Sequence, residues 1–340
     1  MSDLRTVTVS GTYYEQGCQH GAALADVIRE LVAQYLDRVD WHSERAQKYL
    51  RLLEENTHRW AAPLLEELQG IAAGSGVAYE ELWAYNCLAD LGRVHQFCTN
   101  VAFRYTPEGP ALGKTNDIGK DAQRNHALFR RTEGEGAPLL LATWPGTIWA
   151  NCFVTLSGLV FGGANVSQRA RCEEGLPSNV LLRWIAEAAK DVEEAVALVQ
   201  ETPIMHHPIN ITLADAEGHL VVVEKSPKGC AVREPDERGV IFATNHFCSP
   251  PLRGTDTPPP ELRANSEARF ANLQRLTATG PYTVERIQAI LADHTTPGAI
   301  CQHGAGEMWT SVAYVALPRP RTLHFAYGRP CEVPFATFTL

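Results

Sequence analysis

The stretch HQFCTNVAF, residues 95–103, marks the place where the character of the chain changes. Before it, apolar residues recur at intervals of three and four, which is typical of helices. From Cys98 onward they form short runs rich in β-branched and aromatic residues and bounded by glycine, proline or asparagine, which is typical of strands. The sequence therefore predicts a helical front segment, residues 1–97, followed by a part in which strands dominate, residues 98–340.

The front segment contains several predicted elements. A strand opens it, because LRTVTV alternates in polarity, and four helices follow. Proline suits a first helical turn, so Pro63 is expected to open the third helix. The predicted spans are 4–9 for the strand and 17–39, 43–60, 63–74 and 79–91 for the helices.

The second part alternates blocks of strands with two helical regions. These regions begin at about Ser178 and Asn265, and PPLRGTDTPPPELR (250–263) is predicted to be a proline-rich surface loop. Elements in blocks favour an α+β architecture with antiparallel or mixed sheets over a doubly wound parallel sheet. The GxGxxG and GxxxxGK[ST] fingerprints of nucleotide-binding folds do not occur in the sequence.

Composition excludes several classes of function. The net charge is -9, which argues against a nucleic-acid partner and gives no reason to expect binding to an anionic membrane. The first residues lack the apolar stretch of a signal peptide. The nine cysteines are scattered and none forms a CxxC pair, which indicates reduced thiols in a cytoplasmic protein.

Cys98 stands at the switch between the two parts, and chemistry that uses an N-terminal residue needs such an arrangement. A cut before the first strand would free an α-amino group, whose pKa near 7.7–8 leaves it partly neutral at pH 7. The amine can then take a proton from the thiol of the same residue. The plainer interpretation is a buried structural thiol, as expected for most of the cysteines.

Motifs in a fixed order resemble a known family. They are GTYYEQGCQHG, EELQGIAAGSGVAYEELWAYN, CTN, GKTNDIG, TNHF and NSEARFANLQRL. Over roughly residues 8–330 the chain resembles the acyl-coenzyme A:isopenicillin N (6-aminopenicillanic acid) acyltransferase-like family. This is a branch of the N-terminal nucleophile (Ntn) hydrolases related to choloylglycine hydrolases. The resemblance implies a four-layer αββα sandwich with antiparallel sheets. It also implies self-cleavage before a cysteine nucleophile, and attack on an amide, thioester or ester carbonyl.

The resemblance carries over residue by residue. Cys98 matches the nucleophile, with the cut between Phe97 and Cys98. Asp117 matches an aspartate that orients the new amino group, and Asn245 looks like the oxyanion-hole amide. Without the family, Asp117 would be taken as a turn residue and Asn245 as the end of a strand. Relatives usually place a small residue before the nucleophile, so Phe97 is a departure that bears on the rate of maturation.

Several further residues are candidates for supporting roles. Ser266 or Asn265 could instead be a helix N-cap, and Arg269 could form a surface salt bridge or pair with Asp117 or a substrate carboxylate. Lys114 could be a surface lysine. The supporting candidates are Lys114, Asn165, Ser266, Arg269 and His246.

Three other kinds of protein compete with this interpretation. A Cys-His hydrolase without self-cleavage would use His246, since His95 is too near Cys98 in sequence. A zinc site would start from His206 and His207, but adjacent residues on a strand point to opposite faces and HExxH spacing is missing. A protein that kept the fold and lost the reaction is disfavoured because Cys98, Asp117 and Asn245 are all present.

The sequence thus predicts a cysteine amidohydrolase made as a precursor and acting on a small N-acyl substrate. An acyl-CoA-dependent N-acyltransferase of the same fold is the alternative. No metal or organic cofactor is expected, with acyl-CoA as a conceivable co-substrate, and the 1–97 fragment should stay bound as a heterodimer partner, with higher oligomers left open. Core packing is favoured over an acyl pocket for Trp144, Trp149 and Phe161.

Overall fold

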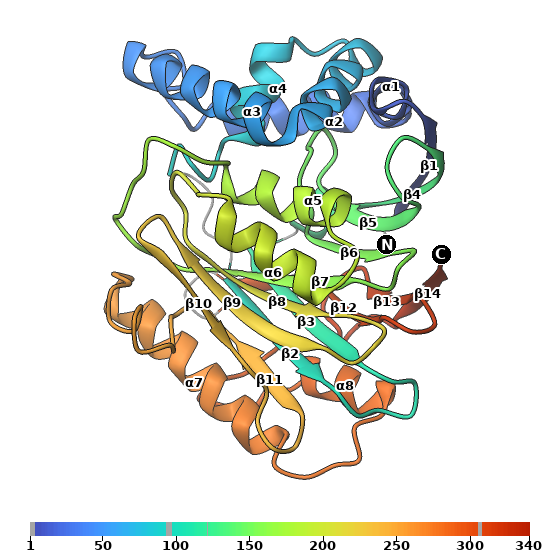
Figure 1. Cartoon of the computed structure of the whole chain (residues 1–340), viewed down its shortest axis with the longest axis vertical. Helices are drawn as coiled ribbons and strands as arrows, with labels where there is room; N and C mark the ends of the chain where they lie inside the picture. Colours follow the sequence, from blue (N-terminus) through green and yellow to red (C-terminus); the bar gives the residue numbers. More distant parts are fainter. Residues whose placement is uncertain (1–3, 93–96, 121, 305–307) are drawn as a thin grey trace.

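The computed structural model describes residues 4–92, 97–120, 122–304 and 308–340, and its elements stack in four layers (Figure 1). Two sheets lie face to face in the middle, with helices outside each of them. Among the described residues, one sheet has eight strands and the other has six. The predicted αββα architecture is therefore confirmed.

The first sheet has the strand order β1-β4-β5-β6-β7-β8-β9-β10. Its neighbours pair antiparallel except at the edge, where β1 runs parallel to β4. The predicted opening strand is thus present and belongs to this sheet. The strands are β1 (Arg5–Gly11), β4 (Ala127–Gly134), β5 (Leu139–Thr143), β6 (Cys152–Thr155), β7 (Val160–Asn165), β8 (Ile209–Ala214), β9 (Leu220–Ser226) and β10 (Gly229–Arg233).

The second sheet has the strand order β11-β2-β3-β12-β13-β14 and is antiparallel throughout its described pairs. Every residue of β2 and β3 is buried. These two strands lie inside the sheet, with one face toward the other sheet and one toward helices. The strands are β2 (Phe97–Phe103), β3 (Ala111–Ile118), β11 (Val240–Ala243), β12 (Trp309–Leu317), β13 (Thr322–Ala326) and β14 (Ala336–Thr339).

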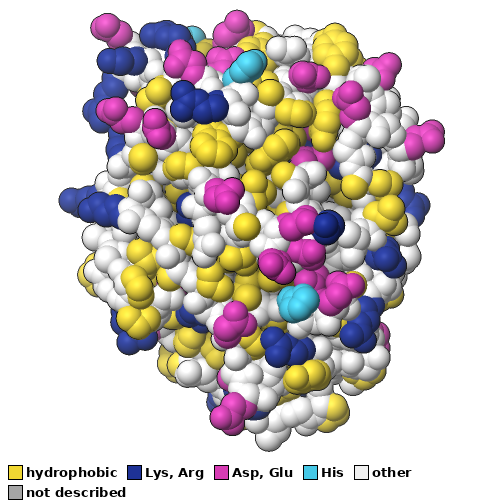
Figure 2. Space-filling model, in the orientation of Figure 1, with side chains coloured by type: hydrophobic (Ala, Val, Ile, Leu, Met, Phe, Trp, Pro, Cys, Tyr) yellow, Lys and Arg dark blue, Asp and Glu magenta, His cyan; other side chains and the backbone are white. Residues whose placement is uncertain are grey.

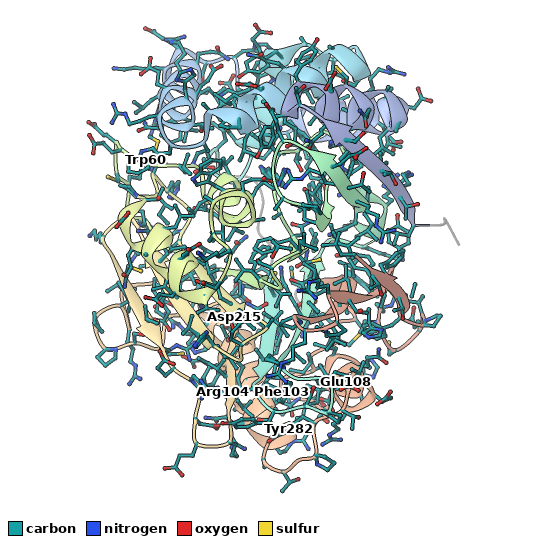
Figure 3. The ribbon with its side chains drawn as sticks, turned by 45° about the vertical axis from the view of Figure 1, so that its right-hand side comes forward. Trp60, Phe103, Arg104, Glu108, Asp215 and Tyr282 are labelled. Atoms are coloured by element: carbon teal, nitrogen blue, oxygen red, sulfur yellow. The ribbon has the colours of Figure 1, made fainter. Side chains whose placement is uncertain are left out.

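Three apolar cores separate the layers. The core between the sheets takes residues from both, such as Leu128 and Tyr314. A second core lies between the first sheet and helices α1–α6, and a third lies between the second sheet and helices α7–α8. In the third core the rings of Phe103 and Tyr282 are 4.5 Å apart, and both are labelled in Figure 3. These helices are α1 (Tyr13–Ala23), α2 (Ala25–Leu36), α3 (Glu44–Ser75), α4 (Tyr79–Asn86), α5 (Ser178–Ala188), α6 (Val192–Glu201), α7 (Pro260–Leu276) and α8 (Val284–Leu291), and a short 3-10 helix covers Ala122–Asn125.

The break expected between the helices at 43–60 and 63–74 is confirmed, because α3 loses its helical angles at Ala61 (φ -147°, ψ 44°), just before Pro63. Other predicted boundaries were wrong. The helix expected at 17–39 is divided at Leu24 into α1 and α2, and the helix expected at 79–91 ends at Asn86. The loop expected at 250–263 ends early, since α7 already begins at Pro260, where proline fits the first turn.

Helices α1 and α3 touch through glycines. A Cβ on Gly17 would lie 2.0 Å from the carbonyl oxygen of Glu67, and a Cβ on Gly70 would lie 2.0 Å from that of Tyr14. Gly21 and Gly74 repeat this contact one turn further along. Each helix therefore places two glycines four residues apart against the backbone of the other, and no larger residue fits there without a shift.

Buried charges join the front segment to the rest of the chain. Arg183 of α5 donates to Glu67 of α3 at 3.0 Å and forms a 2.8 Å ion pair with Glu187. Arg131 and the hydroxyl of Tyr13 also contact Glu187, each at 2.8 Å. Because these charges are almost fully buried, removing one partner would leave another unpaired at a cost of about 3–5 kcal/mol.

The surface carries charges of both signs. Figure 2 shows acidic and basic side chains interspersed with apolar ones over one face of the molecule. Within the described ranges, no helix combines the length and the apolar character needed to cross a membrane.

Candidate active site

Cys98 lies near the beginning of β2, in the interior of the second sheet, and is 1% exposed. It pairs with Asn116 on β3, and Phe97 pairs with Asp117. Opposite residues in an antiparallel pair lie on the same face of the sheet, so this register brings Asn116 next to Cys98. Residues 93–96, just before the strand, lie outside the described part of the chain, and His95 is one of them.

Side chains from three other segments contact three different atoms of Cys98. Its backbone nitrogen donates to Oδ1 of Asn245 at 3.2 Å, and its carbonyl oxygen accepts from Nη1 of Arg269 at 2.8 Å. Its Sγ lies 3.5 Å from Oδ1 of Asn116. These partners come from the loop after β11, from α7 and from β3, so the fold converges on this residue.

Asp117 is buried in β3, so it is not the turn residue that the sequence alone would suggest. Its carboxylate accepts hydrogen bonds from Thr310 at 2.6 Å and from Thr115 at 3.4 Å. Burial raises the pKa of Asp117 to about 6, although the charge of Arg269 and the two hydroxyls oppose the rise. The group therefore changes its protonation state near neutral pH.

The thiol of Cys98 is held in its protonated form. Burial raises its pKa, and the negative charge of Asp117 adds to the rise, while the positive charges of Lys114 and Arg269 oppose it. Lys114 is itself buried, so it is not a surface lysine. Its Nζ donates to the carbonyl oxygen of Asn151 at 3.3 Å.

Asn245 is central to the hydrogen-bond network, and Asn165 contacts it. The side-chain nitrogen of Asn245 donates to the carbonyl oxygen of Asn165 at 2.8 Å, while its backbone nitrogen donates to Oγ of Ser266, also at 2.8 Å. The predicted oxyanion role stays a prediction. To serve it, the amide must turn from the Asn165 carbonyl toward an acyl oxygen.

Ser266 and Arg269 lie one turn apart inside α7, so they project from the same side of the helix. Ser266 is therefore not the N-cap. Arg269 is fully buried rather than part of a surface salt bridge. Besides Cys98 it donates to Thr99 at 2.8 Å, to Asn245 at 2.7 Å and to Asn265 at 2.9 Å. It acts on Asp117 through its charge, which lowers the pKa of that carboxyl group.

The two histidines near the site have different surroundings. His246 places Nδ1 2.8 Å from Oγ of Ser266 and 3.2 Å from Oγ1 of Thr244, and its ring lies 5.4 Å from that of Phe270. These contacts are with α7 and with Thr244, just after β11, rather than with the Cys98 thiol. His126 approaches Cys98 indirectly, since its Nε2 is 3.3 Å from Nδ2 of Asn116.

Three residues of this network escaped the sequence analysis: Asn116, Thr99 and Thr310. Asn116 stands beside Asp117 in GKTND, and Thr99 follows Cys98, so both lay within quoted motifs. Their roles depend on the register between β2 and β3, which the motifs do not give. Thr310 comes from β12, far away in sequence, and carried no signal of its own.

A hollow of about 230 Å³ adjoins the site. Its lining includes Phe97, Asn165, Asn245, His206 and His207. Phe97 is thus part of the wall of this hollow, whereas Cys98 is not among its lining residues.

The aromatic residues considered for an acyl pocket lie elsewhere. Trp144, Trp149 and Phe161 are at most 1% exposed and belong to the core between the first sheet and the helices. Packing in the core is therefore confirmed for all three.

Comparisons with known proteins agree with the resemblance. The family model described as Acyl-coenzyme A:6-aminopenicillanic acid acyl-transferase matches residues 151–330, just over half of the chain. The matched range includes Asn165, Asn245, Ser266 and Arg269, whereas Cys98 precedes it. No curated protein matches the chain.

Similar solved structures include three hydrolases. A mutant of conjugated bile acid hydrolase from Clostridium perfringens has a TM-score of 0.42 and 11% identity, covering 72% of this chain and 97% of its own. A Caenorhabditis elegans ortholog of N-acylethanolamine-hydrolyzing acid amidase has a TM-score of 0.48 and 14% identity. This match covers 65% of this chain and 93% of the ortholog's chain. Penicillin V acylase from Agrobacterium tumefaciens has a TM-score of 0.43 and 14% identity. This match covers 68% of this chain and 83% of the acylase chain.

Proposed function

Because the chain belongs to the Acyl-coenzyme A:6-aminopenicillanic acid acyl-transferase family, we propose that it is an enzyme that cleaves or transfers the acyl group of a small N-acyl compound, with Cys98 as an N-terminal nucleophile. The observation that carries this proposal is the contact of Asn245, Arg269 and Asn116 with three different atoms of Cys98. A merely structural thiol needs no such set of polar partners, since buried cysteines behave as small apolar groups.

The first step is maturation. The Cys98 sulfur attacks the carbonyl carbon of Phe97, the C–N bond of that peptide breaks, and the thiol proton ends on the new amino group. Water then hydrolyses the thioester, which returns the thiol and leaves Phe97 with a free carboxylate. Asp117, opposite Phe97 in the ladder and with a pKa raised to about 6, is the group we assign to orient the new amino group.

The mature site uses the same groups for the substrate. The freed amino group of Cys98 takes the thiol proton, and the sulfur attacks the substrate carbonyl to form an acyl-thioester. Asn245 already accepts from the Cys98 nitrogen and is placed to position the amine. Turned away from Asn165, its amide would stabilise the oxyanion, which is worth about 3 kcal/mol for donors of this kind.

The hollow beside Phe97 is the proposed acyl site. Phe97 forms part of its wall in the uncut chain, and a cut would release the Phe97 carboxylate from its place in β2. The hollow would then open toward Sγ of Cys98. Its volume of about 230 Å³ suits a small acyl group rather than a large ligand, since sites for drug-sized ligands occupy about 300–1,000 Å³.

The final acceptor decides between the two activities. Water gives hydrolysis of the acyl-enzyme, and an amine gives transfer, for which acyl-CoA is a conceivable donor. The two fragments should remain together as a heterodimer, because α1–α4 share an apolar core with the first sheet. No resident cofactor is required by these steps.

Intact-mass spectrometry under denaturing conditions tests the proposal directly. Two fragments that meet between Phe97 and Cys98 are the expected result, and they would justify a screen of N-acyl compounds. A single chain of 37.4 kDa that also resists thiol labelling and shows no amidase or acyl-transfer activity would contradict it.

A further inference from the structure

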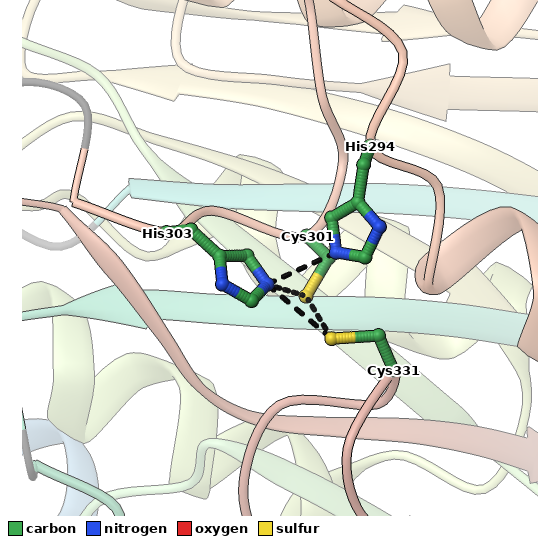
Figure 4. Close-up of side chains that lie close together, drawn as sticks. All are labelled: His294, Cys301, His303 and Cys331. Carbon is green, nitrogen blue, oxygen red and sulfur yellow. Dashed lines mark hydrogen bonds between the residues drawn. The ribbon is translucent and has the colours of Figure 1, made fainter.

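Four side chains with metal-binding atoms that take no part in the Cys98 contacts described above converge at one point (Figure 4). His294 follows α8, Cys301 and His303 lie in the segment that leads to β12, and Cys331 lies between β13 and β14. One ligand atom from each lies within 4.8 Å of all the others. The connection between α8 and β12 therefore meets the turn between β13 and β14 at one point.

The distances suit a tetrahedral metal ion. The two sulfur atoms are 3.6 Å apart, and the two Nε2 atoms of His294 and His303 are 3.0 Å apart. Nε2 of His303 is 3.3 Å from the sulfur of Cys331 and 3.5 Å from that of Cys301. Ligands bound to zinc at about 2.0–2.3 Å with tetrahedral angles lie roughly 3.3–3.8 Å from one another, so small adjustments would suffice.

Charge and chemistry favour zinc in particular. Two thiolates and two neutral imidazoles are a common donor set of closed structural zinc sites, and the two thiolates neutralise the ion's charge. Beside the cluster, Oε1 of Glu332 lies 4.0 Å from Nδ1 of His303, the nitrogen that faces away from the other ligands. Glu332 is held by Arg329 at 2.5 Å. Zinc-binding histidines commonly donate their outer nitrogen to a carboxylate, and Glu332 would form such a hydrogen bond after a small shift toward His303.

A disulfide between the two cysteines explains the cluster less well. It would use only the sulfur atoms, and the 3.0 Å contact between the two imidazole nitrogens would be a separate hydrogen bond with no part in it. A metal ion accounts for all four side chains at once. The sequence analysis expected no metal, because these ligands match no compact motif such as CxxC or HExxH.

We propose that His294, Cys301, His303 and Cys331 bind one Zn²⁺ ion as a structural site. The ion joins the end of α8 and the segment before β12 to the C-terminal hairpin. Between two of the ligands, the backbone nitrogen of Gln302 donates to Oγ1 of Thr310 at 2.8 Å, and this hydroxyl donates to Asp117 at 2.6 Å. The zinc site therefore holds the segment that positions the Asp117 carboxylate, and it does not depend on the proposed activity.

The test is the metal content of the full chain. Protein purified from zinc-supplemented cells without an affinity tag that binds metals should carry one zinc per chain by elemental analysis. Exchange for Co²⁺ should give the visible and thiolate charge-transfer absorption of a tetrahedral site. Cys331→Ser and His294→Ala should weaken zinc binding by on the order of 100-fold or more, since even loss of an outer partner costs about 10–100-fold.

Matched variants make the outcome decisive. Cys230→Ser, a half-buried cysteine outside the cluster, should keep its zinc and its cobalt spectrum. Glu332→Gln should lower the affinity by about 10-fold while the cobalt spectrum stays tetrahedral. Zinc-free wild-type protein after supplementation, whether with free thiols or lighter by two hydrogen atoms through a disulfide, would overturn the proposal. Undiminished zinc in Cys331→Ser and His294→Ala would overturn it as well.

Discussion

Phe97 and Asp117 lie directly opposite each other in the antiparallel ladder of β2 and β3. The peptide bond that the proposed maturation breaks therefore lies beside a buried carboxyl group. Asp117 sits in this place because Thr310 and Thr115 hold its two oxygens. The chemistry proposed for Cys98 depends on this pairing of Phe97, at the start of β2, with the acidic residue Asp117 on β3.

Substitution of Cys98 tests the nucleophile. Cys98→Ala should yield an uncut chain with no acyl-cleaving activity, because alanine has no thiol to form the thioester. Intact mass measures the cut, and an assay of acyl release from N-acyl compounds measures the activity. Cys152→Ala, another fully buried cysteine, serves as the control and should be cut normally. Cleavage between Phe97 and Cys98 in the Cys98→Ala protein would falsify self-processing by this thiol.

The pH dependence of the mature enzyme follows from Asp117. Because burial raises its pKa to about 6, the carboxyl group is neutral below this pH and ionised above it. The ionised form is the better acceptor for the freed amino group, so kcat/KM for an N-acyl substrate should rise with pH through about 6. In Asp117→Asn this rise should vanish and kcat/KM should fall by about 100-fold or more.

The raised pKa of Asp117 also affects the free energy of unfolding, which should fall as the pH rises. A carboxyl group whose pKa is higher in the folded state binds its proton more tightly there. Its contribution to stability is thus fully present below the unfolded value near 3.9 and is lost as the pH rises through about 6. Precursor carrying Cys98→Ala should lose stability over this range relative to the double variant with Asp117→Asn, as urea unfolding can measure.

Phe97 should limit the rate of maturation. A smaller residue there frees the backbone at the scissile bond, so Phe97→Gly should be cut on the order of 10-fold faster, which corresponds to about 1.4 kcal/mol of relieved constraint. A gel-based time course of precursor cleavage measures this. Phe103→Gly removes the same side chain from the other end of β2 and should not accelerate cleavage. Equal acceleration in both variants would point to general loosening instead.

Arg269 is expected to act by position as well as by charge. Arg269→Lys keeps the charge but cannot reach Cys98, Thr99 and Asn245 together, so kcat should fall by about 100-fold with a smaller change in KM. Arg275→Lys on the same helix changes a half-exposed arginine and is the control. Similar losses in both would show that α7 tolerates no lysine, rather than that Arg269 orders the site.

The contact between α1 and α3 offers a prediction about stability. Gly17→Ala should lower the free energy of unfolding by about 1–3 kcal/mol, although alanine favours helices, because its Cβ would meet the Glu67 backbone. Urea unfolding measures the loss. Ala22→Leu adds a larger group on an exposed position of the same helix and should change little. A more stable Gly17→Ala protein would mean that the two helices do not pack this closely.

Much of the fold could be predicted from the sequence, because periodicity and composition report on burial. The helical front, the opening strand and the switch at Cys98 all appear in the structure. The break expected before Pro63 is present as non-helical angles at Ala61, whereas the helix expected at 17–39 is divided at Leu24, where neither neighbouring residue is a glycine or a proline. For the site, motifs indicated Cys98 and Asp117, but the roles of Asn116 and Thr310 depend on strand register and on a distant strand, which local pattern does not encode.

The parallel pairing of β1 with β4 has a consequence for how the protein can refold. If the bond before Cys98 is cut as proposed, β1 and β4 belong to different chains, and so do the partners in the buried ion cluster of Glu67 and Arg183. Folding of the precursor is unimolecular, but refolding of the cut protein would have to bring two chains together. The mature protein should therefore recover poorly from complete denaturation when dilute, and its lifetime would depend on how slowly it unfolds rather than on an equilibrium.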